Sequence, residues 1–282
     1  MALSNDWVWF VTGSSSGFGR LFVEKALDEG WRVAATARSP SALNDLAARY
    51  GDKLLPLALD LTDPATIEAA INAAHEKFGS VDVLVNNAGY GYLAAIEEGE
   101  EPEIRTLFDV NVFGLAATIR AALPGMRTRK RGWIVNVTSI GGLVGNPGSG
   151  YYAASKFAVE GLSEALAKEV EPHGIGVLVV EPGPSRTPWA RAVQQSQEHP
   201  AYADTSGARR RLIIELDGKQ PGDPARGVDL VVAALQSENP PQRLVLGRMA
   251  VAATKAKLAQ VLDDVTAWEE RSAATDFAIA QP

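Results

Sequence analysis

The chain has 282 residues and a formal net charge of −7, which argues against nucleic acid or an anionic membrane as its main partner. Hydrophobic residues make up 46% and charged residues 22%, as in ordinary globular proteins, and we find no segment long and apolar enough to span a bilayer. The lack of cysteine excludes disulfides and thiolate metal sites, and the three histidines are too scattered to suggest a metal site. Because the N-terminal residues also lack a signal-peptide pattern, we expect a cytoplasmic protein without a metal.

The first predicted element is a buried strand at residues 7–11, which a glycine-rich segment follows. The strand is short, β-branched and aromatic, and Gly13, Gly17 and Gly19 precede apolar residues at helical spacing. A glycine loop at a helix N-terminus lets backbone N–H groups approach a phosphate. We therefore predict a dinucleotide pyrophosphate site, with an ordinary turn as the alternative. The Gly-x-x-x-Gly-x-Gly spacing differs from the usual Gly-x-Gly-x-x-Gly fingerprint.

Predicted strands and helices then alternate along the chain. Further strands are predicted at residues 31–37, 54–59, 81–85, 133–137, 177–181 and 243–246. Helices are predicted at residues 41–50, 63–78, 102–127 (as one or two helices), 151–171 and 224–236. Strands separated by helices form a parallel sheet through right-handed crossovers, with both faces covered. We therefore predict one doubly wound Rossmann-type α/β domain of about seven strands over residues 1–282.

Two segments depart from this alternation. Residues 184–223 are rich in Pro, Gly, Gln and Arg, which indicates a substrate-side insertion with short helices rather than more sheet. Residues 250–282 form a predicted C-terminal helical tail, in which Ala, Lys and Leu recur at helical spacing to about residue 272. The domain thus carries a C-terminal helical extension on the substrate side.

The chemistry is predicted around Tyr152 and Lys156, which lie four residues apart and therefore on one face of a helix. A lysine at that spacing lowers the phenol pKa by its positive charge, so that the tyrosine can exchange a proton near neutral pH. Ser139 follows a predicted strand and therefore shares the carboxyl edge of the sheet, where open α/β folds bind ligands. Taken alone, the Tyr152 and Lys156 pair could also be an ordinary surface pair.

At this point the chain resembles the short-chain dehydrogenase/reductase family over roughly its first two thirds. The motifs that carry the resemblance are the glycine segment 12–19, the Asn-Asn-Ala-Gly segment 86–89, Asn111, Ser139, Tyr152-x-x-x-Lys156 and the Pro-Gly segment 182–187. They occur in the family's order and at its spacing. The last third, around residues 244–248 and 268–271, is similar to the longer members described as 17β-hydroxysteroid- or retinol-dehydrogenase-like.

The resemblance implies a role for each of these residues. Tyr152 would be the general acid/base, and Lys156 would lower its pKa and bind the nicotinamide ribose. Ser139 would hold the substrate oxygen, and Asn111 would hold a water that links Lys156 to solvent, while the cofactor supplies the hydride. The implied cofactor-binding residues are Gly13, Ser15, Ser16, Gly17, Phe18, Gly19, Arg38, Asp60, Leu61, Asn87, Ala88, Gly89, Tyr152, Lys156, Pro182, Gly183 and Thr187.

The resemblance also separates these contacts by their place on the cofactor. Asp60 and the Leu61 backbone would contact the adenine, although Asp60 could equally begin a turn or cap the next helix. Asn86 would tie strands together, while residues 87–89 line the ribose. Thr187 would bind the nicotinamide carboxamide.

The end of the strand at residues 31–37 predicts which cofactor is preferred. An NAD-preferring site places a carboxylate there, but this chain has Ala37 followed by Arg38. A guanidinium can pair bidentately with a 2′-phosphate, which a carboxylate would repel. We therefore predict NADP(H), with NAD(H) possible, against the alternative that Arg38 is a solvated strand-end residue.

The substrate is expected to be hydrophobic, because apolar and aromatic residues occupy the positions that would face it. These residues are Tyr90, Tyr92, Leu143, Pro147 and Trp189, although such residues can also be plain core. The basic cluster at 209–211 is interpreted as solvated surface. The predicted function is NADP(H)-dependent interconversion of a hydrophobic secondary alcohol and its ketone, in a homodimer or homotetramer. The alternative is a non-catalytic NADP(H)-binding sensor, which would have no need of the proton relay.

Overall fold

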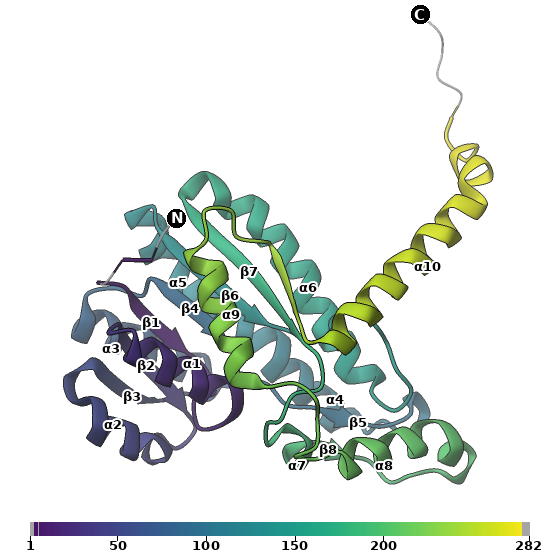
Figure 1. Ribbon diagram of the computed structural model, residues 1–282, viewed down its shortest axis with the longest axis horizontal. Helices are drawn as coiled ribbons and strands as arrows, with labels where there is room; N and C mark the ends of the chain where they lie inside the picture. The colour runs from purple at the N-terminus through teal and green to yellow at the C-terminus, as the bar shows by residue number, and fades with distance from the viewer. Residues whose placement is uncertain (1–2, 5, 278–282) are drawn as a thin grey trace, which may run out of the picture.

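The computed structural model describes residues 3–4 and 6–277, and its centre is a seven-stranded parallel sheet in the order β3-β2-β1-β4-β6-β7-β9 (Figure 1). The strands are β1 (Val8–Val11), β2 (Arg32–Ala37), β3 (Leu54–Ala58), β4 (Val83–Asn86), β6 (Gly132–Val137), β7 (Ile175–Pro182) and β9 (Arg243–Leu246). The strand order reverses between β1 and β4, and in such sheets the ligand crevice opens at the carboxyl ends beside that reversal. The predicted doubly wound Rossmann-type fold is confirmed.

Helices cover both faces of this sheet. They are α1 (Gly17–Asp28), α2 (Asn44–Tyr50), α3 (Pro64–Phe78), α4 (Glu101–Phe108), α5 (Leu115–Arg129), α6 (Gly150–Val170), α7 (Trp189–Ala192), α8 (Ala208–Glu215), α9 (Pro224–Gln236) and α10 (Arg248–Ala273). Shorter helical turns are η1 (Pro40–Leu43), η2 (Gly51–Lys53), η3 (Ile96–Glu98), η5 (Ile140–Gly142), η6 (Glu171–His173) and η7 (Pro200–Tyr202). Two π-helical segments are η4 (Asp109–Gly114) and η8 (Ala203–Gly207).

The two faces of the sheet form two apolar cores. On one face, α1 and α9 pack through residues such as Phe22 and Val231 onto β1, where the indoles of Trp9 and Trp31 stack 5.2 Å apart. On the other face, α3, α5 and α6 pack through residues such as Ile71 against Phe10 and its neighbours. Burial on both faces explains why the strands read as nearly continuous apolar runs rather than alternating ones.

The boundaries of two helices follow from an Asp-Pro pair at the start of each. The Asp63 carboxylate accepts the Ala65 backbone N–H at 2.9 Å, and Pro64 occupies the first turn of α3, where its missing N–H is not needed. Asp223 caps α9 in the same way. The predicted bounds of 224–236 and 243–246 match α9 and β9.

One helical stretch corrects our expectation that nothing in the chain could span a bilayer. Residues Glu101–Arg129, interrupted by η4, are long and apolar enough by length and composition alone. Yet this stretch supplies Leu115, Ile119 and Met126 to the core beneath the sheet, so it packs as a core helix.

The segment 184–223 also differs from its prediction. It contains α7, η7, η8 and α8 as expected, but also the two-residue strand β8 (Gln194–Gln195), which pairs in parallel with β5 (Tyr92–Leu93). Because β8 is formed by a partner about a hundred residues away, no local pattern marks it. The predicted tail 250–282 begins two residues inside α10, and its last residues, 278–282, lie outside the described part of the chain.

Candidate active site

Buried amides fix the central strands beneath the crevice. The Asn86 side chain donates to the Asn136 amide oxygen at 2.9 Å and accepts from the Thr118 hydroxyl at 2.6 Å. The Asn136 amide in turn donates to the Ser163 hydroxyl at 2.8 Å. This chain joins β4, β6, α5 and α6, so Asn86 ties strands together as predicted.

Ser139 and Tyr152 meet at the carboxyl edge of this sheet. Ser139 follows β6 and accepts the Gly141 backbone N–H at 3.0 Å, while its side chain lies close enough to the Tyr152 phenol, in the first turn of α6, to lower the pKa of that phenol. A Cβ added to Gly141 would lie 3.3 Å from the Tyr152 ring and 3.4 Å from the Ser139 hydroxyl. Gly141 therefore leaves room for the two side chains to approach each other.

Lys156 lies one turn further along α6 and is buried. Its Nζ lies 5.9 Å from the centre of the Tyr152 ring and donates to the Val137 carbonyl oxygen at 3.0 Å. Burial lowers the pKa of the Lys156 ammonium to about 8, an effect that the Glu160 carboxylate partly opposes. The ammonium thus faces the end of β6 from inside the protein.

The pKa of Tyr152 differs from the sequence expectation. Burial raises the pKa of the phenol to about 12, and the hydrogen bond with Ser139 lowers it only in part. We expected Lys156 to bring this pKa near neutrality, but in the protein alone desolvation is the larger effect. The phenol is therefore protonated at neutral pH, which suits a general acid.

Asn111 lies in the π-helical segment η4, fully buried beside Lys156. Its Oδ1 accepts the Tyr90 backbone N–H at 3.1 Å, and its Nδ2 donates to the Tyr90 carbonyl at 3.0 Å and to the Ser155 hydroxyl at 3.1 Å. The amide group thus holds the loop after β4 against α6. Any water held for Lys156, as the resemblance implies, remains a prediction.

The glycine loop between β1 and α1 is closely fitted to its neighbours. Gly13 has φ +69°, and a Cβ there would lie 2.8 Å from the Ala88 Cα. A Cβ at Gly19 would overlap the Gly13 carbonyl oxygen and the Asn87 amide. No other residue type fits either position, so the backbone of the glycine loop packs closely against residues 87–88, which follow β4.

The start of α1 suits the phosphates of a dinucleotide. Ser15 and Ser16 are exposed, the Ser16 hydroxyl makes no capping bond, and no acidic residue occupies the first turn. Gly17, at φ +56°, lies against Thr187, where an added Cβ would be 3.4 Å from the threonine Cβ. Free N–H groups and an uncapped helix end fit a pyrophosphate.

Several predicted cofactor residues also have partners within the protein, and their contacts with a cofactor stay predictions. The Asn87 side chain donates to the carbonyl oxygens of Thr12 and Gly13, at 3.0 and 3.1 Å, so it holds the glycine loop in place. Phe18 packs against α9 at Gly227, with 3.1 Å from an added Cβ to its ring. Ala88 donates its N–H to the Thr12 hydroxyl at 3.0 Å.

Gly89 adjoins two of the predicted catalytic side chains. A Cβ at Gly89 would lie 2.9 Å from the Asn111 Oδ1 and 3.6 Å from the Lys156 Nζ. Gly89 therefore lets the loop after β4 approach Asn111 and Lys156 closely.

Two of the residues at the predicted adenine end, Asp60 and Arg38, are exposed. Asp60 accepts the Thr62 N–H at 2.9 Å and the Thr62 hydroxyl at 2.7 Å, which lowers the pKa of its carboxyl, so its side chain forms the turn that we weighed as an alternative. Leu61 is buried against Gly114 of η4. Arg38 is exposed at the end of β2, next to the buried Ala37.

The segment after β7 contains the residues predicted to bind the nicotinamide. Pro182 ends that strand, the Gly183 N–H donates to the Leu246 carbonyl at 2.9 Å, and Thr187 is partly buried. Trp189 then places its ring 5.4 Å from that of Tyr152. An aromatic wall thus stands beside the phenol, as the sequence suggested for Trp189.

Two substrate-side expectations are corrected. Tyr92 is buried, and its hydroxyl accepts the Glu100 backbone N–H at 2.9 Å, so it belongs to the core. Arg210 is 3% exposed and forms an ion pair with Glu98 of η3, and it also donates to the Ser196 carbonyl at 3.1 Å. The basic cluster at 209–211 is therefore not simply solvated, because Arg210 fixes residues 184–223 to the η3 loop.

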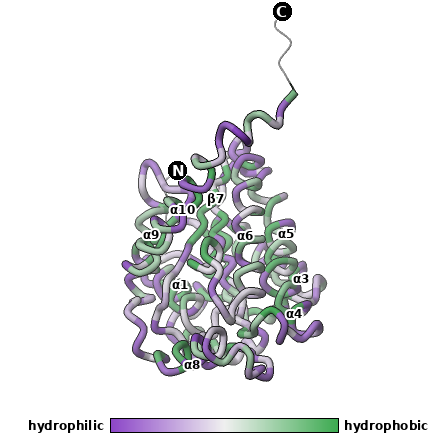
Figure 2. Tube along the Cα trace, turned by 90° about the vertical axis from the view of Figure 1, so that its right-hand side faces the viewer, coloured by the Kyte–Doolittle hydropathy of each residue, from purple (hydrophilic) through white to green (hydrophobic). Residues whose placement is uncertain are grey.

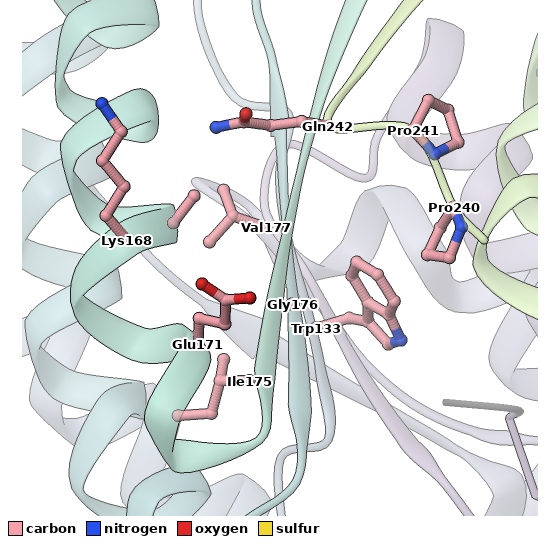
Figure 3. A pocket seen from close by; sticks show the side chains of 10 residues that line it. Trp133, Lys168, Glu171, Ile175, Gly176, Val177, Pro240, Pro241 and Gln242 are labelled. Carbon is pink, nitrogen blue, oxygen red and sulfur yellow. The ribbon is translucent and has the colours of Figure 1, made fainter.

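A cavity of about 270 Å³ lies at the opposite edge of the sheet (Figure 3). It is lined by Trp133 and Gly176, near the amino ends of β6 and β7, by Lys168 near the end of α6 and by Glu171 at the start of η6. Ser139 follows the carboxyl end of β6, so this cavity is separate from the site.

Comparison with known proteins identifies the family. The family model described as short chain dehydrogenase matches residues 8–198. Oxidoreductase BOA17 of Botryotinia fuckeliana is 38% identical over 272 residues, which cover 95% of this chain and 98% of that protein. A 3-ketodihydrosphingosine reductase of Bacteroides thetaiotaomicron is 37% identical over 240 residues, covering 84% and 86%. The chain belongs to the short-chain dehydrogenase/reductase family and is an NAD(P)-dependent oxidoreductase. Neither relative is described as a steroid or retinol dehydrogenase, so the family follows from them and that subtype does not.

Solved structures agree. A short-chain dehydrogenase from Streptomyces avermitilis matches with a TM-score of 0.90 and 44% identity, covering 96% of this chain and 100% of that one. A Burkholderia phymatum family member in complex with NAD matches at 0.80, with 27% identity and coverage of 88% and 92%. A metagenomic short-chain oxidoreductase in complex with NADP matches at 0.68, with 26% identity and coverage of 86% and 98%. Structures of this fold thus hold either cofactor.

Proposed function

We propose that this protein is a carbonyl reductase and alcohol dehydrogenase that interconverts a hydrophobic secondary alcohol and its ketone, with NADP(H) as the preferred cofactor. The observation that carries the proposal is the convergence of Ser139, Tyr152 and Lys156 beside the glycine loop. Ser139 follows the carboxyl end of β6, and Tyr152 and Lys156 lie in the first two turns of α6. We further propose that the enzyme works in the cytoplasm as a homo-oligomer.

The residues of this site divide the reaction between them. NADPH supplies the hydride when it is bound. The Tyr152 phenol, protonated at neutral pH, donates its proton to the carbonyl oxygen of the ketone, and in the reverse direction its phenolate accepts the proton of the alcohol. The Ser139 hydroxyl holds the same oxygen, and the buried Lys156 ammonium stabilises the phenolate that forms. In the proposed complex, Lys156 also holds the nicotinamide ribose, which would lie above Gly89.

A hydrophobic substrate is proposed because the surroundings of Tyr152 are apolar. The Trp189 ring adjoins the phenol. Leu143, which lies close to Ser139 in the sequence, and Tyr90, which follows Gly89, are both partly buried. The Bacteroides relative is also named as a reductase of a 3-keto compound. Secondary alcohols with apolar substituents fit such surroundings, which are typical of small-molecule sites.

The experiment that tests this function follows NADPH absorbance, with NADH in parallel, over a panel of hydrophobic ketones, aromatic aldehydes and quinones. Turnover of a ketone with NADPH is the expected result. Aldehyde turnover without ketone turnover would contradict the substrate class, and tight NADPH binding without any turnover would contradict the reaction.

We expect Arg38→Asp to reduce the NADPH-to-NADH ratio of kcat/KM by about 10- to 100-fold, because a charge-assisted pair is replaced by repulsion of the 2′-phosphate. Arg38 is exposed, so the variant should fold normally. Arg226→Asp, the same charge change at another exposed arginine, is the control and should leave the ratio unchanged. An unchanged ratio in Arg38→Asp would remove the argument for NADP(H).

A further inference from the structure

The C-terminal helix α10 stands apart from the rest of the molecule. It begins after Gly247, and its first turn packs on Gly183, where an added Cβ would lie 3.0 Å from the Ala250 Cβ. Ala250 is the buried side chain of the helix, and every described residue from 255 to 277 is exposed. The helix extends away from the sheet in both views of the molecule (Figures 1 and 2).

The exposed part of α10 is not uniformly polar. We define the α10 stripe as Val251, Leu258, Val261, Val265 and Trp268, whose exposed fractions are 39%, 61%, 42%, 61% and 58%. With Thr254, these positions alternate in steps of three and four residues, which is the spacing of the buried seam of a two-helix coiled coil. Helices gain most of their stability by packing such a face, so the stripe predicts a partner helix.

The charges of α10 indicate the direction of that partner. The half nearer the body carries Lys255 and Lys257, whereas the outer half carries acidic residues at 263–264 and 269–270. A parallel copy would place the lysines of both helices side by side, but an antiparallel copy places the basic half of each beside the acidic half of the other. We propose that α10 pairs antiparallel with α10 of a second copy of this chain.

The stripe also sets the register of the pair. It overlaps itself completely when Val251 of one copy lies opposite Trp268 of the other and Leu258 lies opposite Val261. In this register Lys257 of each copy faces Asp264 of the other, so the two-fold axis produces the pair twice. The proposed interface and the proposed reaction can be tested independently, because mass in solution reports on the interface and turnover reports on the reaction.

The first test is the mass in solution, from sedimentation velocity or light scattering. The wild type is expected to be a dimer or a larger even oligomer, and Leu258→Glu with Val265→Glu is expected to halve its mass. Both residues are exposed within one copy, so the variant should keep the fold and its NADPH binding. Leu230→Glu, at a 49% exposed leucine on α9, is the matched control and should leave the mass unchanged. A monomeric wild type, or an unchanged mass in the double variant, overturns the proposal.

The second test exchanges charges. Lys257→Glu is expected to weaken association about tenfold, and adding Asp264→Lys is expected to restore it. The two positions lie seven residues apart, about 10 Å along one helix, so they do not pair within a copy. Failure of the second substitution to restore association overturns the antiparallel register.

Discussion

The Tyr152→Phe variant is expected to lose about 10²- to 10⁴-fold in kcat while it binds NADPH as tightly as the wild type. The change removes one hydroxyl, which is the proposed proton donor beside Ser139. The ring and its contact with Trp189 remain, so the shape of the site is preserved. Steady-state kinetics and NADPH fluorescence titration measure the two quantities separately.

Tyr151→Phe is the matched control for that variant. Tyr151 precedes the active tyrosine on α6, and its hydroxyl donates to the Ile96 carbonyl at 2.6 Å. Removing it deletes one loop contact but no reacting group, so kcat should fall by less than about threefold. Equal losses in the two variants would show that the Tyr152 hydroxyl has no special part in the reaction.

Replacement of Lys156 by Met should abolish turnover and yet make the protein more stable. Because burial lowers the pKa of Lys156 from 10.5 to about 8, the folded state holds this proton less strongly than the unfolded chain. The difference destabilises the wild type by about 3 kcal/mol at neutral pH. The lost bond to the Val137 carbonyl offsets about 1 kcal/mol, which leaves a net gain of about 2 kcal/mol for Lys156→Met.

The pH dependence of this gain has a definite sign. The full penalty is present in the wild type below about pH 8 and disappears as the pH rises to about 10.5, so the two proteins converge in stability over that interval. Denaturant unfolding across pH measures it. Lys168→Met, at an exposed lysine of the same helix that pairs with Glu164, should change stability by less than about 0.5 kcal/mol. A wild type more stable than Lys156→Met at neutral pH would show that the ammonium is not destabilising.

The fold could be predicted because its signals are local. Apolar runs bounded by glycine define β1 and β2, and Asp63 with Pro64 marks the start of α3. The α4–α5 junction could not be resolved in the same way. A π-helical segment adds a residue to a turn while the apolar spacing around it hardly changes, so residues 102–127 read as ordinary helix.

The candidate site was predicted where one motif holds several side chains, as with Tyr152 and Lys156 on α6. It was missed where the partner is distant in sequence. Arg210 pairs with Glu98 across 112 residues, and the three arginines in a row looked like surface. The only signal for a buried arginine was weak: in the short helix α8, the arginines stand directly beside apolar residues.

Asn87 and Tyr152 illustrate a second reason for the differences. The sequence predicted that Asn87 lies next to the cofactor, but it did not predict the two hydrogen bonds from its amide to the glycine loop. It predicted that Tyr152 is the acid/base residue, yet the direction of the Tyr152 pKa shift depends on how much solvent the fold removes. Neither the hydrogen bonds of Asn87 nor the desolvation of Tyr152 can be predicted from a local sequence pattern.

Residues 184–223 contact the predicted site through Thr187 and Trp189 near their start, whereas the rest of the segment is attached elsewhere. Their buried anchor, Arg210, meets the η3 loop, which carries none of the reacting groups, whereas Ser139 and Lys156 stand on the sheet and on α6. Substitutions after Trp189 can therefore accumulate without moving Ser139 or the buried Lys156 ammonium. In evolutionary terms, we expect descendants of this protein to acquire new substrates by changes in that single stretch while they keep the proposed catalytic residues.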